Sequence, residues 1–190
     1  RLASVDRVEL QGPIELTGRP LDLAIEGTGF FRVQLPNGQF AYTRDGSFNL
    51  SEQGTLVTHG GYVVQPNITV PEDADEVSIS RTGVVTVTTA GSTEPVELGR
   101  IELVRFANPT ALRSLGENLL QESGASGAPV LGFPQDAGLG RVVQGSLEGS
   151  NVEIVQEMVE MITAMRAYEI NSKAVQSAEQ MAETANGLLR

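Results

Sequence analysis

The chain has 190 residues, of which 40% are hydrophobic, so it can form one folded domain or a smaller domain with an appendage. Its formal net charge of −11 and its single lysine, Lys173, leave no basic patch, which argues against a nucleic-acid-binding protein. The lack of cysteine excludes disulfides and thiolate nucleophiles, and no apolar run approaches the roughly 20 residues of a membrane-spanning helix. We therefore expect a folded protein that is not inserted in a membrane.

Residues 1–20 are interpreted as an N-terminal connector, and a regular pattern starts at Leu21. Turn-forming pairs recur about every eight residues, and branched and aromatic residues lie between them. Asn-Gly and Asp-Gly supply the positive φ angles of tight hairpin turns, so this spacing predicts a β-meander over residues 35–64, within a mostly antiparallel β-domain that runs from Leu21 to about Val104. The pairs are Asn37-Gly38, Asp45-Gly46, Gln53-Gly54 and Gly60-Gly61.

Most of the aromatic residues lie in this meander, where they alternate with polar residues. Because one face of such a sheet is apolar, these rings are predicted to form the core of a β-rich outer domain spanning residues 21–145. The predicted core residues are Phe30, Phe31, Phe40, Tyr42, Phe48 and Tyr62.

Less regular sequence follows the meander. Segments 77–80, 83–89 and 95–106 are rich in Val, Ile and Thr and predict further strands. From Asn108 to Gly149 the chain is rich in Gly, Ser, Ala and Pro, a composition typical of loops. We expect this part to be a connection with one short helical turn near residues 109–119, and not a second core.

The period of the pattern changes in the C-terminal segment, residues 146–190. Ser150 and Glu153 have the spacing of a capping box, and neither proline nor glycine follows until Gly187. The sequence predicts a helix of about 36 residues, or about 54 Å at 1.5 Å per residue, far longer than the usual 11 or 12. A core of this size cannot cover such a helix along its length.

The apolar residues of this helix follow spacings of three and four, as in coiled coils. Small residues in its second half would let another helix approach closely. We predict a coiled-coil-type assembly helix, the alternative being a core helix folded over its own sheet. The predicted subunit-packing residues are Ile154, Met158, Met161, Ile162, Met165, Tyr168, Ile170, Ala174 and Met181.

The sequence offers no catalytic, cofactor-binding or metal-binding residues. His59 is the single histidine and lies beside a glycine pair, which is typical of a solvated turn. The acidic run 71–76 lacks the ligand spacing of an EF-hand loop. The glycines of segment 27–31 have no βαβ pattern around them and are predicted to permit close backbone approach at a strand entry. We expect no enzyme and no cofactor.

A resemblance to a known family rests on two segments. "LDLAIEGTGFFRVQLPNGQFAYTRDGSFNLSEQGTLVTHGGYVVQP", residues 21–66, resembles the bacterial flagellar rod and hook family. "SNVEIVQEMVEMITAMRAYEINSKAVQSAEQM", residues 150–181, resembles the C-terminal helix of that family. Residues 116–129 and 166–174 are most similar to its distal-rod members. The resemblance covers nearly the whole chain in collinear order.

The resemblance implies a structural subunit of the distal rod of the flagellar basal body. Such subunits form a helical homopolymer, a tubular drive shaft that transmits motor torque through the periplasm to the hook. The implied partners are the chain itself, other rod and hook proteins, and the surrounding ring proteins. Export by the flagellar secretion system without a cleaved signal peptide is also implied.

The resemblance also implies that the chain is a fragment. Members of the family begin with a long helix that pairs with the C-terminal helix, and this sequence starts downstream of it. Two alternatives stay open: a hook or proximal-rod subunit of the same family, and an unrelated surface adhesin-type β-domain with a helical stalk.

Overall fold

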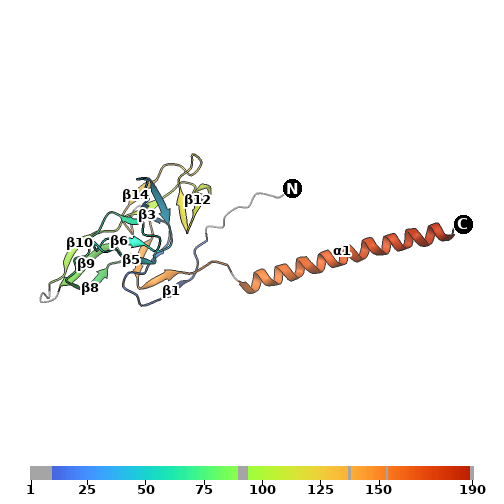
Figure 1. The fold of residues 1–190 in the computed structure, drawn as a ribbon, viewed down its shortest axis with the longest axis horizontal. Helices are drawn as coiled ribbons and strands as arrows, with labels where there is room; N and C mark the ends of the chain where they lie inside the picture. The colour runs from blue at the N-terminus through green and yellow to red at the C-terminus, as the bar shows by residue number, and fades with distance from the viewer. Residues whose placement is uncertain (1–9, 90–93, 137, 153, 189–190) are drawn as a thin grey trace. The chain divides into compact units, whose positions relative to one another are not determined.

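The computed structural model describes residues 10–89, 94–136, 138–152 and 154–188. The chain divides into two compact units, one ending at Asn151 and the other starting at Val152. The first, the β-unit, consists of antiparallel sheets and one 3₁₀ turn, and the second is a single helix (Figure 1). This confirms the predicted fold class, mainly β with a long C-terminal helix.

The largest sheet places β3 at its centre. β4 lies on one side of β3, and both β11 and β7 lie on the other. The strand order is β12-β13-β4-β3-β7-β6-β5, with β11 pairing with both β3 and β14. The strands are β3 (Phe30–Gln34), β4 (Phe40–Thr43), β5 (Phe48–Leu50), β6 (Leu56–Thr58), β7 (Val63–Gln65), β11 (Leu103–Arg105), β12 (Arg113–Gly116), β13 (Leu119–Gln121) and β14 (Val130–Gly132).

Three smaller sheets complete the β-unit. β8, β9 and β10 form a separate antiparallel sheet at one end of it (Figure 1). Two two-stranded sheets join segments far apart in sequence, β1 with β16 and β2 with β15. The strands are β1 (Ile14–Leu16), β2 (Leu23–Glu26), β8 (Ala74–Ile79), β9 (Val84–Thr89), β10 (Val96–Arg100), β15 (Arg141–Gln144) and β16 (Ser146–Glu148).

Two apolar clusters lie in the β-unit. The main core contains Phe31 and Phe48, whose rings meet edge to face at 5.1 Å between centroids. A second cluster holds Phe30, Tyr42 and Phe106. All members of both clusters fall between Leu21 and Val142, so the β-unit builds its core from its own residues.

The turns of the meander follow the prediction at three of four glycine pairs. Hairpins connect β3 to β4, β5 to β6 and β6 to β7 at the expected positions. The prediction is wrong at Asp45-Gly46, because β4 and β5 do not pair with each other. Gly46 instead meets β2: its carbonyl accepts a hydrogen bond from the Leu23 amide at 3.0 Å, and a Cβ there would lie 1.7 Å from the Leu23 carbonyl oxygen.

The interpretation of residues 108–149 as a mere connection is also wrong. The segment contains β12 to β16, and its strands extend the main sheet or pair with β1 and β2. Leu112 lies in the second apolar cluster, with Leu120 packed against it. The short helical turn is present at Pro109–Ala111. Pairing with other strands stabilises β12 to β16, although a Gly- and Ser-rich composition does not favour strands.

Four of the six predicted core aromatics are buried, namely Phe30, Phe31, Tyr42 and Phe48. Tyr62 is half-buried against the main core. Phe40 contradicts the prediction, since its side chain is 42% exposed at the start of β4. It packs under the guanidinium of Arg32, which lies 4.8 Å from the ring centroid. An aromatic ring on the polar face of a strand can be stabilised this way without entering the core.

The helical unit is α1 (Ile154–Leu188), 35 residues long, close to the predicted length. Glu153 of the expected capping box lies outside the described residues, so this expectation has no structural test. Within the part of the chain that the structure describes, no helix is both long and apolar enough to cross a membrane.

Phe48→Ala should lower the free energy of unfolding by about 3–5 kcal/mol, because the ring is fully buried and its removal leaves a cavity beside Phe31. Phe40→Ala is the matched control, with an expected loss of about 0.5–1 kcal/mol from its contact with Arg32. Urea denaturation of both variants measures the difference. Equal losses would contradict this placement of the two rings.

Candidate functional site

A dense set of polar contacts lies at the junction where the chain enters and leaves the β-unit. The entering segment contains β1 and the leaving segment β16, and the two strands pair from Ile14↔Glu148 to Leu16↔Ser146. Beyond the ladder, the Gly149 amide donates to the Pro13 carbonyl at 2.8 Å. Gly12 lets the two backbones approach, since a Cβ there would lie 2.0 Å from the Gly149 carbonyl oxygen. The chain ends of the β-unit are thus joined as one ribbon.

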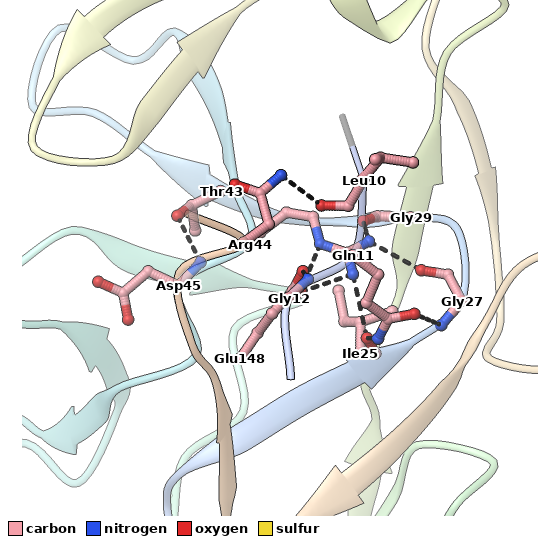
Figure 2. Close-up of polar contacts among 11 residues, drawn as sticks. Leu10, Gln11, Gly12, Ile25, Gly27, Gly29, Thr43, Arg44, Asp45 and Glu148 are labelled. Carbon is pink, nitrogen blue, oxygen red and sulfur yellow. Dashed lines mark hydrogen bonds and ion pairs between the residues drawn. The ribbon is translucent and has the colours of Figure 1, made fainter. Parts of the chain in front are cut away.

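Arg44 fastens this ribbon to the rest of the β-unit. Nε and Nη2 donate to one carboxylate oxygen of Glu148 at 2.8 and 2.6 Å. Nη1 donates to the carbonyls of Gly27 at 2.8 Å and Gly29 at 2.9 Å, and Nη2 donates to the Ile25 carbonyl at 3.1 Å (Figure 2). These contacts use all five N–H donors of a guanidinium. Arg44 therefore joins β16 to the turn between β2 and β3.

Gln11 and Glu148 extend the network to the entering segment (Figure 2). The Gln11 side-chain amide donates to the Ile25 carbonyl at 2.9 Å, and its oxygen accepts from the Gly27 amide at 3.0 Å. The second carboxylate oxygen of Glu148 accepts from the Gly12 amide at 3.1 Å. We name Gln11, Arg44 and Glu148 the junction clamp, because together they hold both chain segments to the β2–β3 turn.

The burial of the junction clamp makes these contacts energetically significant. The side chains of Arg44 and Glu148 are only 23% and 13% exposed. A charge-assisted pair that is largely withdrawn from water is screened less than a surface pair, and removing one partner leaves the other without compensation. The pair between Arg141 and Glu26 is about 40% exposed on both sides and contributes less.

Asp45 lies next to the clamp and is held by its own hydrogen bonds. Ser47 donates to one carboxylate oxygen through its amide at 3.0 Å and its hydroxyl at 2.6 Å, and Asn118 donates to the other at 3.2 Å. Burial by itself raises the pKa of Asp45, but the hydrogen bonds from Ser47 and Asn118 and the nearby charge of His59 outweigh it. The pKa of Asp45 consequently lies below its ordinary value of 3.8.

A groove of about 910 Å³ opens beside the junction clamp and is lined by Leu10, Gly29, Arg44, Asn118 and Leu147 among others. Its size would suit a small ligand. However, the donors of Arg44 are already occupied by protein acceptors, and no group of three or more potential metal ligands occurs among the described residues. The groove therefore carries no assigned chemistry.

The predicted subunit-packing residues lie along α1. Ile154 is the first residue of the helix, and Ala174 is exposed within it. The large apolar side chains described on α1 are about half exposed or more, with Tyr168 reaching 77%. They are spread around the helix and do not form one narrow stripe. These exposed side chains are Val155, Met158, Val159, Met161, Ile162, Met165, Tyr168, Ile170, Val175 and Met181.

Sequence reasoning did not identify the junction clamp. Glu148 is 104 residues from Arg44 and Gln11 is 33 residues from it, so no local spacing connects them. The available signal was that Arg44 is the one basic residue between the aromatic residues Tyr42 and Phe48 in a turn-rich segment. A charged side chain there needs a partner, but the sequence does not say which one.

Two family models match the chain. Residues 24–87 match the flagellar hook protein FlgE/F/G D1 domain, and residues 143–188 match the C-terminal segment of flagellar basal body rod FlgEFG proteins. The flagellar basal-body rod protein FlgG of Borreliella burgdorferi is 48% identical, with 100% of this chain and 72% of the relative covered. The chain belongs to the FlgG family of flagellar basal-body rod proteins.

Other relatives agree with this assignment. FlgG of Bacillus subtilis is 40% identical over 98% of the chain and 72% of its own length. The rod protein FlgF of Caulobacter vibrioides is 35% identical over 92% of the chain and 68% of its own length, against 44% for FlgG of the same organism. Membership of the FlgG family excludes an unrelated adhesin-type domain. The higher identity to FlgG than to FlgF favours FlgG over another rod subunit. The FlgG family is a family of structural proteins of the flagellar basal body.

Arg44→Lys should destabilise the β-unit by about 1–3 kcal/mol, because three ammonium donors in a different geometry leave carbonyls or Glu148 unsatisfied. Arg141→Lys is the control, since its exposed pair with Glu26 should cost about 0–1 kcal/mol. Urea denaturation measures both. The junction clamp would lose its assigned importance if the two substitutions cost the same.

Acidification should destabilise the β-unit through Asp45. Its folded pKa is depressed, so the stability it contributes is present above the unfolded value of 3.8 and is lost as the pH falls through the lower folded pKa. Asp45→Asn should therefore flatten the acid limb of the stability profile. Asp75→Asn, at an exposed position in β8, controls for the change in net charge. An unchanged acid limb in Asp45→Asn would refute this role.

Proposed function

We propose that the chain is a subunit of the distal rod, which polymerises with copies of itself into the tubular shaft that transmits motor torque to the hook. Family membership supports the rod assignment, and α1 supports the polymer. In this proposal residues 21–145 form the outer domain of the subunit and residues 146–190 form its assembly segment, with residues 1–20 connecting the two layers.

The observation that carries this proposal is the exposure of apolar side chains along α1. Fully burying one large side chain yields roughly 1.5–3 kcal/mol, and several such side chains line the helix. Among the residues whose side chains the structure describes, the two core clusters of the β-unit contain none from α1. Neighbouring helices are the partners that can cover an apolar surface spread around a helix, which makes a dense helical layer in the polymer.

The junction clamp would give the polymer its stiffness under torque. Load applied to the β-unit reaches the helical segment through residues 146–151, and Arg44 ties this segment to the β2–β3 turn. Because all five donors of the planar Arg44 guanidinium are engaged, the ribbon is held at several acceptors and cannot pivot about a single hydrogen bond. The β-unit and its exit strand would then move as one body.

The remaining assignments also follow the family. We propose a location in the periplasmic part of the basal body and export by the flagellar secretion system without a cleaved signal peptide. The partners would include other rod proteins, the hook and the surrounding ring proteins.

Met158, Met161 and Met165 replaced together by Gln should reduce self-association of the chain, because these side chains are all more than half exposed on one part of α1. Sedimentation measures the association, and thermal unfolding reports on the β-unit, which should be unchanged. The matched control replaces Glu157, Glu160 and Glu169 by Gln on the same helix.

The same triple change in the full-length protein should prevent rod formation and motility in a strain that lacks the native gene. Unchanged association and normal rods would contradict the assembly role of this surface. Unfolding of the β-unit by the triple change would show that these methionines belong to its core.

A further inference from the structure

Among the described residues, the main sheet of the β-unit ends in three strands that pair on one side only, β14, β12 and β5. One row of this sheet runs β14-β11-β3-β4-β13-β12. Among the described residues β14 pairs with β11 alone and β12 pairs with β13 alone. Each outer strand therefore presents one row of backbone N–H and C=O groups away from the sheet, which is a template for another strand.

The β14 edge has no charged residue, although the strand is short and follows Pro129. Val130 and Leu131 are 47% and 46% exposed, and successive residues point to opposite faces of a strand, so neither face is covered. No charged residue occurs from Gly124 to Phe133. Natural sheets usually block such edges with charges, bulges or a covering loop.

The β12 edge is also unpaired among the described residues, although its ladder with β13 has a bulge between Ser114 and Gly116, and it carries charges that match those near β14. All four residues of β12 are exposed, including Leu115 at 45%. Arg113 begins the strand, and the exposed Glu117 follows its last residue. Near β14 the exposed Arg105 lies opposite Val130, and the exposed Asp136 lies beyond the other end of the strand.

We propose that β12 of one subunit pairs antiparallel with β14 of a second copy of this chain. This inference rests on the proposed function, because it names a contact within the polymer. In the antiparallel direction Arg113 lies toward the end of β14 that leads to Asp136, and Glu117 lies toward the end where Arg105 stands on the neighbouring strand β11, so opposite charges lie toward the same end of the ladder. The parallel direction would bring like charges together at both ends, which disfavours it.

This pairing generates a filament. β12 and β14 are different surfaces, so the contact is heterologous, and each added copy leaves one β12 edge and one β14 edge open for the next. Three or four residues per strand form too short a ladder to associate alone, and Pro129 offers no amide at the start of β14. The edges would pair after the helices have brought neighbouring subunits together.

Cysteine cross-linking in assembled rods tests this contact, because the chain contains no cysteine. Two double variants of the full-length protein are needed, Leu115→Cys with Leu131→Cys and Leu115→Cys with Val130→Cys, since a shift of one residue reverses the faces. Opposed residues of paired strands lie within disulfide range. We expect one double variant to give a ladder of covalent multimers on oxidation.

The control variants distinguish pairing of β12 with β14 from the close packing of all subunits in the rod. Each single variant should give no ladder, and neither should Leu115→Cys with Val96→Cys, which lies on the edge strand β10 and is exposed at 51%. Arg113→Glu should lower the cross-linking yield, and adding Asp136→Arg should restore it. Rods that form normally but give no ladder in either test variant would overturn the β12–β14 contact and leave the proposed function intact.

A failure of the unmodified full-length protein to form rods would instead overturn the proposed function, and this contact with it.

Discussion

The apolar surface of α1 is the main physical constraint on this molecule. A helix of 35 residues with exposed Met, Ile, Val and Tyr side chains is not stable in isolation by propensity alone, and packing must supply the rest. The β-unit completes its two apolar clusters with residues up to Val142. In the proposed function, association with other subunits of the rod would bury this surface.

The β-unit has the properties that a load-bearing outer body needs. Its strands are short, and its sheets join segments distant in sequence, such as β1 with β16 and β2 with β15. Arg44 and Gln11 then tie both chain ends to the same β2–β3 turn. Long-range pairing of this kind resists local opening, because a local fluctuation would break contacts in more than one sheet. We expect the β-unit to be rigid because of this topology and because the Arg44 guanidinium has all its donors engaged.

Local patterns predicted local structure well. The helix followed from its 3.6 period and the lack of proline and glycine, and three hairpins followed from glycine pairs. The prediction of a hairpin at Asp45-Gly46 was wrong because the dipeptide that suits a hairpin also suits close contact with another strand, here β2. The choice between the two depends on Leu23, which is 23 residues away from Gly46 in sequence.

Long-range structure was beyond the reach of the sequence patterns. The strands within 108–149 lack the usual density of branched residues, and they are ordered by pairing with β1, β2, β4 and β11. Phe40 was predicted to lie in the core because aromatic rings are usually buried. In the structure the Arg32 guanidinium holds its ring on the outer face instead. Glu148 and Arg44 form a contact that only the folded chain defines.

A density map of the rod assembled from the full-length protein would show whether α1 is buried between subunits. We expect Met158, Met161 and Met165 to contact helices of other copies in the inner wall, with the β-unit outside. A map in which α1 faces solvent, or folds onto the sheet of its own β-unit, would contradict it.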